Sequence, residues 1–218
     1  MRHEVTTRRV LYEIPGMRSV PVRDASFVAA DGRPLPMKVY GDRGPVVVIL
    51  EGYPDAGFQK HVGCTFMEME WTISMAQLIA GSGMQAVTHS NRDPLPDARA
   101  LLRQLTHDAG VGVWSTSGHG PVAIAAASDA ACAVLINPVV GEAPPPGVPI
   151  FIARAGQDET PGLNLTLDAF VQKALADNRP ITLVNHADAP HSFDLFLDGR
   201  ETRRILQQGL DFLRGHLG

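Results

Sequence analysis

The sequence predicts an α/β fold in which helices flank an eight-stranded, mostly parallel sheet. Short apolar runs alternate with longer amphipathic runs along most of the chain, which is the pattern of strand–helix–strand units. One of the short runs, Val46–Leu50, is continuous and rich in β-branched residues, as expected for a strand buried on both faces. Because no linker divides the 218 residues, we expect a single domain over residues 1–218.

The individual elements follow from these runs in order. The first two strands are expected to form a hairpin, because the turn-forming pair Asp31-Gly32 lies between two extended segments. The remaining strands are separated mostly by helical patterns. The predicted strands cover residues 26–29, 37–40, 46–50, 85–88, 111–114, 133–136, 150–153 and 181–184. The predicted helices cover residues 66–80, 97–106, 118–127, 163–176 and 201–216.

Composition and charge restrict the functions to be considered. The net charge of −4 provides no basic field that would attract nucleic acid or an anionic membrane. Residues 1–17 carry several charges without the apolar core of a secretory signal, and no run approaches the roughly 20 apolar residues that a membrane span needs. Cys64 and Cys132 are too few for a disulfide framework. We therefore expect a cytoplasmic enzyme or binding domain.

A predicted strand runs almost directly into a predicted helix around Ser117. The apolar strand 111–114 precedes this serine, and small residues at Gly118 and Gly120 permit a very tight turn. Such a turn exposes the serine hydroxyl and points the next amide, that of Gly118, to where an oxyanion would form. His119 departs from the usual Gly-x-Ser-x-Gly pattern, in which this position faces a neighbouring strand closely. A backbone shift at Gly120 would relieve that crowding.

A serine hydroxyl needs a base, and the base needs a group that orients it. In sheets of this kind, the acid follows the next-to-last strand and the histidine follows the last strand. Asp158 lies on a glycine-containing turn after strand 150–153, and His191 follows the loop after strand 181–184. Ser117, Asp158 and His191 therefore occupy the three positions of a catalytic triad in the expected order.

Four other residues compete for these roles. His186 is an alternative base, but it comes early in its loop, where it would lie near the sheet. Glu159 directly follows Asp158, and Asp188 belongs to the histidine loop, so each is expected to be a solvated carboxylate. Ser115 lies two residues too early and should point back into its strand.

The loop after strand 46–50 provides a candidate for the second oxyanion donor. It reads Glu51-Gly52-Tyr53-Pro54 and is similar to the His-Gly-x-Pro loop of many hydrolases, whose x residue supplies a backbone amide. The expected donors are thus the amides of Tyr53 and Gly118. Glu51 stands where a histidine is usual, and it either pairs with a polar group behind the loop or contacts the resting nucleophile. Glu51 and His119 are the candidate substrate-binding residues.

Together these features resemble the α/β-hydrolases over roughly residues 25–217. The His191–Phe193 segment and the helix ending Leu210–Leu213 are similar to the small, capless dienelactone-hydrolase-like group. Many hydrolases of this architecture insert a cap domain where this chain has only the 13 residues 137–149, so we expect no cap and a shallow, open site. The namesake of the group uses a cysteine nucleophile, whereas this chain has Ser117, which favours general ester chemistry.

The expected activity is that of a serine hydrolase acting on a small carboxylic ester, thioester or lactone, with no metal and no organic cofactor. One alternative is a binding protein with little turnover, in which His119 crowds the turn and misplaces Ser117. Another is an acyltransferase or perhydrolase with the same triad. His61 and Cys64 are spaced like part of a metal site, but no second pair lies nearby, so no zinc site is expected.

Two further groups of residues lie where a pocket could form. Residues 89–92 follow a strand at the same edge of the sheet as the triad, and they either line the pocket or form a solvated loop. A set of apolar side chains surrounds the first long helix. Its expected role is core packing, although side chains that face the open site could bind an acyl chain. This set comprises Met67, Met69, Met75, Met84 and Trp71.

Overall fold

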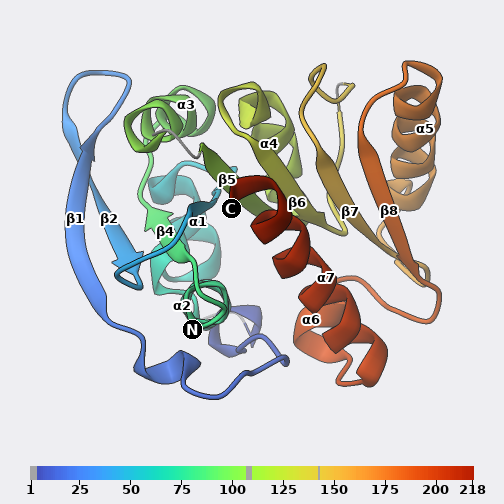
Figure 1. Cartoon of the computed structure of the whole chain (residues 1–218), viewed down its shortest axis with the longest axis horizontal. Helices are drawn as coiled ribbons and strands as arrows, with labels where there is room; N and C mark the ends of the chain where they lie inside the picture. Colours follow the sequence, from blue (N-terminus) through green and yellow to red (C-terminus); the bar gives the residue numbers. More distant parts are fainter. Residues whose placement is uncertain (1–3, 107–109, 142) are drawn as a thin grey trace.

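The computed structural model describes residues 4–106, 110–141 and 143–218, and the predicted fold class is confirmed. The strands are β1 (Val22–Val28), β2 (Pro34–Tyr40), β3 (Val46–Ile49), β4 (Gln85–His89), β5 (Val111–Thr116), β6 (Cys132–Ile136), β7 (Ile150–Ala155) and β8 (Ile181–His186). They form one sheet in the order β1-β2-β4-β3-β5-β6-β7-β8 (Figure 1). β2 pairs antiparallel with β1 and β4, and every later pair is parallel.

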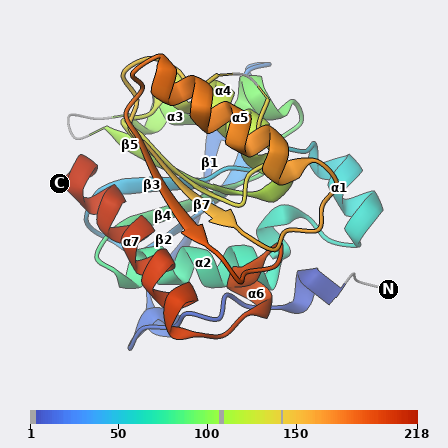
Figure 2. The same cartoon turned by 90° about the vertical axis from the view of Figure 1, so that its right-hand side faces the viewer.

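Helices cover both faces of this sheet. They are α1 (Asp55–Val62), α2 (Glu70–Gly81), α3 (Pro94–Leu105), α4 (Gly120–Ala126), α5 (Leu163–Ala176), α6 (Phe193–Phe196) and α7 (Arg200–Leu217). Helices α3, α4 and α5 lie on one face, and α2, α6 and α7 lie on the other (Figure 2). Among the described residues, no helix is both long and apolar enough to cross a membrane.

The central strands are apolar on both sides because each side meets a helical layer. Val47 and Ile49 of β3 belong to the apolar cluster shared with α2 and α7. Val48 and the following Leu50 belong to the second cluster, shared with α3, α4 and α5. This double burial accounts for the unbroken apolar run that predicted a central strand.

The helices differ from the sequence prediction chiefly in three places, one of which is the short α6, where no helix was predicted. The helix expected at 66–80 is divided, because Met69 is extended (φ −67°, ψ 135°) between a 3₁₀ turn at Phe66–Glu68 and α2. A capping box between Thr65 and Glu68 stabilises the first turn. Helix α1 was not predicted, because it contains Gly57 and buries only its last residue, which leaves no clear apolar stripe.

The N-terminal segment packs on the α2 side of the sheet. Val10 and Met17 are buried in the cluster formed with α2 and α7. The Val10 amide donates to Ser74 Oγ on α2, and the Leu11 amide donates to the Asp194 carbonyl on α6. These bonds carry the segment to the edge of the sheet where the predicted triad lies, a placement that the sequence pattern did not indicate.

Candidate active site

The turn between β5 and α4 has the strained backbone of a nucleophile elbow. Ser117 has φ +48°, in the left-handed region that non-glycine residues rarely occupy. Such strain indicates that the surrounding packing holds the residue in place. The Ser117 carbonyl also accepts the Val139 amide at 2.8 Å, which fixes the turn against the segment after β6.

The crowding expected at His119 is relieved by two glycines. A Cβ atom on Gly120 would lie 2.2 Å from the Val139 carbonyl oxygen, so the close approach that the usual pattern places at His119 occurs one residue later. On the opposite side, a Cβ atom on Gly52 would lie 2.7 Å from the Cα of His119. The elbow therefore accommodates a histidine without displacing Ser117.

The Gly120 contact leads to a stability prediction. Gly120→Ala should lower the free energy of unfolding by about 1–3 kcal/mol, because the clash is with backbone that cannot rotate away. Thermal unfolding of the purified variant measures this loss. Gly57→Ala is the matched control, since apart from its chain neighbours and the backbone of α1 itself no atom lies within 4 Å of the added methyl group. An unchanged midpoint for Gly120→Ala would contradict the packing described here.

The three predicted triad residues lie within hydrogen-bonding distance of one another. Ser117 Oγ is 2.7 Å from His191 Nε2, and His191 Nδ1 is 2.6 Å from Asp158 Oδ2. Asp158 follows β7 and its side chain is fully buried, whereas 29% of the His191 side chain is exposed. A buried acid thus holds a histidine whose other nitrogen faces the serine hydroxyl.

The environment of Asp158 favours its charged form. Burial alone would raise the pKa of Asp158, but hydrogen bonds from the His191 ring and the Thr160 amide outweigh it and lower the pKa. A carboxylate only accepts hydrogen bonds, so Nδ1 of His191 carries the proton. Nε2 is then free to accept the hydroxyl proton of Ser117, as a general base requires.

The loop after β3 lies against the elbow. The Gly52 amide donates to His119 Nδ1 at 2.8 Å, and the Tyr53 carbonyl accepts a bond from Asn91 Nδ2 at 3.0 Å. No acceptor for the Tyr53 or Gly118 amide occurs within the described parts of the chain. The two predicted oxyanion donors therefore lie on segments held together by the Gly52–His119 bond.

A cavity of about 280 Å³ opens beside Ser117 and His191. Its walls come from the N-terminal segment, α1, the turn at Phe66–Glu68, α2 and α6, so the site is more covered than the short β6–β7 connection suggested. The lining is mainly apolar and includes Val5, Phe58, Val62, Phe66, Met69, Trp71 and Leu195. Of the apolar set around the first long helix, Met69 and Trp71 line this cavity, and the buried Met75 and Met84 belong to the core.

Solved structures with the same architecture include esterases. EstE1, a thermophilic and thermostable carboxylesterase cloned from a metagenomic library, aligns with a TM-score of 0.72 and 15% identity over 91% of this chain and 90% of that chain. The chain has the α/β-hydrolase fold.

Two further esterases have this fold as well. A hyperthermophilic esterase from the archaeon Pyrobaculum calidifontis aligns with a TM-score of 0.70 and 17% identity over 92% of this chain and 88% of that chain. Brefeldin A esterase, a bacterial homologue of human hormone-sensitive lipase, aligns with a TM-score of 0.71 and 14% identity over 94% of this chain and 78% of that chain. No family model matches the sequence, and no curated protein matches it. At these identities the likeness establishes the α/β-hydrolase fold alone.

The competing residues lie away from the Ser117 hydroxyl. His186 is buried with Nε2 3.3 Å from Thr202 Oγ1 on α7. Ser115 is buried within β5, and Glu159 and Asp188 are exposed. None of the four lines the cavity beside Ser117. Among the described residues, no three potential ligands are close enough to hold a metal ion, and His61 and Cys64 do not form part of such a group.

Of residues 89–92, Asn91 supports the loop after β3 from behind, and none of the four lines the cavity. Asn91 is buried and bonds both to the Tyr53 carbonyl and to Glu51 Oε2, at 3.0 and 3.1 Å. The sequence allowed two roles for these residues, either lining the pocket or forming a solvated loop. The role of Asn91 as a buried support depends on the direction of its side chain, which the sequence pattern does not reveal.

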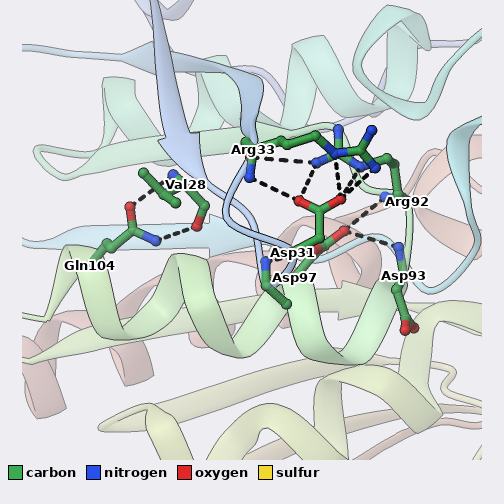
Figure 3. A network of polar contacts seen from close by, with 8 residues as sticks. Val28, Asp31, Arg33, Arg92, Asp93, Asp97 and Gln104 are labelled. Carbon is green, nitrogen blue, oxygen red and sulfur yellow. Dashed lines mark hydrogen bonds and ion pairs between the residues drawn. The ribbon is translucent and has the colours of Figure 1, made fainter.

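A polar network fixes the position of this support (Figure 3). Arg92 pairs with Asp31 of the β1–β2 turn at 2.7 Å. The buried carboxylate of Asp97 on α3 accepts the amides of Arg92 and Asp93 at 2.8 and 2.9 Å. Because Arg92 and, to a lesser extent, Arg33 donate hydrogen bonds to Asp31, the pKa of Asp31 is well below its usual range. The hairpin turn, α3 and the segment after β4 are thereby joined.

Glu51 lies behind the loop and not in the cavity, although it was a candidate substrate-binding residue. Its side chain is fully buried and accepts a bond from Asn91 Nδ2. Burial, the charge of Asp55 and a hydrogen bond to Asp55 raise the pKa of Glu51 to about 10. At neutral pH Glu51 is therefore a neutral acid, whose hydroxyl can donate a hydrogen bond to Asp55.

Glu51→Gln should stabilise the protein increasingly as pH rises. The pKa of Glu51 is about 10 in the folded protein and 4.5 for an unperturbed glutamate. Folding therefore requires no proton uptake by Glu51 below pH 4.5, and above it the wild type loses free energy of unfolding with each pH unit. At pH 7.5 the free energy of unfolding of Glu51→Gln should exceed that of the wild type by at most about 4 kcal/mol. A glutamine amide can donate to Asp55 and accept from Asn91 in the same positions. Unfolding midpoints at pH 5 and pH 8 measure the difference.

The exposed Glu159→Gln serves as the matched control for this substitution. Its midpoint should change little, and equally at the two pH values. If Glu51→Gln gave the same shift at pH 5 and pH 8, Glu51 would not be held protonated by the fold.

Proposed function

We propose that this chain is a serine hydrolase that cleaves small carboxylic esters, thioesters or lactones through an acyl-enzyme intermediate. The observation that carries this proposal is the continuous hydrogen-bonded series from Ser117 through His191 to Asp158, with distances of 2.7 and 2.6 Å. A strained, partly exposed serine beside a histidine with a fixed tautomer has the geometry that acyl transfer requires.

In the first half-reaction, Ser117 Oγ attacks the carbonyl carbon while His191 Nε2 accepts the hydroxyl proton. The Asp158 carboxylate stabilises the imidazolium that forms. His191 then gives the proton to the leaving alcohol, thiol or ring oxygen, and the acyl group stays on Ser117. In the second half-reaction, His191 takes a proton from water as the water oxygen attacks the acyl carbon. His191 then returns that proton to Ser117 Oγ as the bond between Oγ and the acyl carbon breaks, which releases the carboxylic acid and restores the resting enzyme.

The amides of Tyr53 and Gly118 would stabilise the tetrahedral intermediate. Each such donor contributes roughly 3 kcal/mol in sites of this kind. Two features support this role: neither amide has another acceptor in the described parts of the chain, and the Gly52–His119 bond holds one segment against the other. Because the donors are preorganised, little reorganisation is needed during the reaction.

The volume of the cavity favours small substrates. At about 280 Å³ it is at or below the lower limit of pockets for drug-sized ligands, roughly 300–1,000 Å³. We therefore infer short acyl groups, and a strong preference for long acyl chains would contradict this. Within the fold, the dienelactone-hydrolase-like group is the proposed subgroup because of His191–Phe193, with an ester as substrate because the nucleophile is a serine.

The arrangement of the elbow argues against a binding protein without turnover. That alternative depended on His119 misplacing Ser117, and the room provided by Gly52 and Gly120 removes its basis. Transfer of the acyl group to an alcohol or to peroxide would use the same first half-reaction. Product analysis with added methanol or peroxide distinguishes these outcomes from hydrolysis.

A fluorophosphonate probe tests the proposal directly. The folded protein should form a covalent adduct that peptide mass spectrometry locates on Ser117, and prior labelling should stop hydrolysis of 4-nitrophenyl acetate. Heat-unfolded protein is the control and should not be labelled. Labelling at another residue of the folded protein, or none, would end the proposal.

A further inference from the structure

His119 is the second residue after Ser117, and its ring is enclosed by aromatic side chains. Ring centroids of Tyr53, Phe58 and Phe66 lie 5.2, 6.0 and 4.6 Å from that of His119. Only 7% of the residue is exposed, and it lines the cavity beside Ser117. The orientation of this ring is therefore fixed from several sides.

The hydrogen bond from the Gly52 amide determines the tautomer of His119. Because Nδ1 accepts that bond at 2.8 Å, the proton of the neutral ring is on Nε2. Burial lowers the pKa of His119 to about 4, so the ring is neutral at pH 7. Among the described residues, no acceptor for Nε2–H is found. Nε2 is also absent from the polar atoms that are buried without a hydrogen-bond partner, so it is accessible. The accessible N–H thus belongs to the cavity that His119 lines.

Each of the other polar side chains of this cavity outside the triad has a partner, is partly exposed, or, for Asp194 Oδ1, is an acceptor that is buried without a partner. Thr116 Oγ1 donates to a backbone carbonyl at 3.1 Å. Asp194 Oδ2 accepts the indole N–H of Trp71 at 2.6 Å, and its other oxygen is sealed from solvent. Ser192 is partly exposed. His119 is therefore the buried donor that an apolar substrate would leave without a partner, which disfavours such a substrate.

We propose that the Nε2–H of His119 donates a hydrogen bond to the substrate, so that the enzyme selects esters whose cavity-bound group carries an oxygen acceptor. An ether or keto oxygen in a short chain satisfies this donor, and a purely aliphatic chain does not. This inference rests on the proposed function and names the substrate class of the same site.

Pairs of esters that differ by one oxygen test the selection. On the acyl side the pairs are 4-nitrophenyl methoxyacetate with butanoate, and 3-methoxypropanoate with pentanoate. On the alcohol side the pair is 2-methoxyethyl acetate with butyl acetate. Each kcat/KM is divided by the rate constant for alkaline hydrolysis, which removes differences in intrinsic reactivity. The wild type should prefer the ether member of at least one pair by about fivefold to tenfold.

Two variants separate the donor from the structural role of the ring. In His119→Asn, the amide oxygen can take the place of Nδ1 and accept from Gly52, but no donor stands at the Nε2 position. In His119→Gln, the amide nitrogen takes the place of Nε2, and the acceptor for Gly52 is lost. The ether preference should fall below about twofold in the Asn variant. The Gln variant should keep the preference and lose kcat equally for both members of a pair.

Thermal unfolding identifies a variant that does not fold. In that case the inference is decided by whether the wild type prefers the ether member of any ester pair. Ester hydrolysis by the wild type without preference in any pair would overturn this inference and leave the proposed function intact. An ether preference that persists in His119→Asn would also overturn it. Absence of both hydrolysis and fluorophosphonate labelling would instead defeat the proposed function itself.

Discussion

Replacing Ser117 by alanine is expected to reduce kcat for 4-nitrophenyl acetate by about 10⁴- to 10⁶-fold. The cavity side of His191 would then face a methyl group, and no acyl-enzyme could form. The residual rate would come from binding and oxyanion stabilisation alone. Steady-state hydrolysis followed at 405 nm measures the loss, with circular dichroism to confirm that the fold is retained.

Ser115→Ala is the matched control for this prediction. Ser115 is buried in β5, and its hydroxyl has no hydrogen-bond partner, so its removal should change kcat by less than about twofold. Near-normal turnover by Ser117→Ala would contradict the mechanism. A comparable loss in both variants would indicate damage to β5 instead of removal of a nucleophile.

The strands could be predicted because the helical layers impose a simple pattern on them. Val111–Trp114 and Ile150–Ala153 are continuous apolar runs, since both faces of the parallel strands are covered. Helix 163–176 was predicted with its observed bounds, and residues 201–216 differ from α7 by one residue at each end. Such elements carry their own apolar pattern and do not depend on distant contacts.

The candidate triad could also be predicted, because topology places it. Each of the three residues follows a strand of the parallel sheet, and the carboxyl ends of such strands meet at one edge. Type, order and position after a strand therefore suffice to bring Ser117, Asp158 and His191 together. The hydrogen bonds between them are the geometric outcome of that topology.

The parts that could not be predicted depend on tertiary contacts between remote segments. Helix α1 has little amphipathic pattern, yet its Phe58 ring packs at 6.0 Å from both Phe66 and His119. Val5 reaches the cavity only because the N-terminal segment bonds to α2 and α6. Neither feature has a local signal, and both add walls to a site that was expected to be shallow and open.

The departure at His119 shows how two positions compensate for one another. A glycine would normally stand two residues after the serine, and here the required space is provided by Gly52 on the facing loop and by Gly120. The histidine in turn accepts the Gly52 amide, which a glycine could not do. The sequence contained all three residues, but their interdependence becomes visible only when the loop and the elbow are side by side.

Asp158→Asn is expected to lower kcat by about 10⁴-fold with little change in KM. The Asn amide group can present its N–H₂ to His191 Nδ1, which would then have to accept, so the ring proton would move to Nε2 and face Ser117. In that tautomer His191 cannot take the hydroxyl proton. Hydrolysis of 4-nitrophenyl acetate gives kcat and KM separately. Thermal unfolding of the variant confirms that the fold is retained.

The neighbouring Glu159→Gln makes the same chemical change at an exposed position and should leave kcat within about twofold. Comparing the two variants separates the orientation of His191 from the general loss of negative charge near the site. If Asp158→Asn kept most of its activity, another group would have to orient the imidazole. Asp188, which is exposed on the histidine loop, would be the next carboxylate to replace. A large loss confined to position 158 would instead tie catalysis to the 2.6 Å bond between the buried carboxylate and Nδ1.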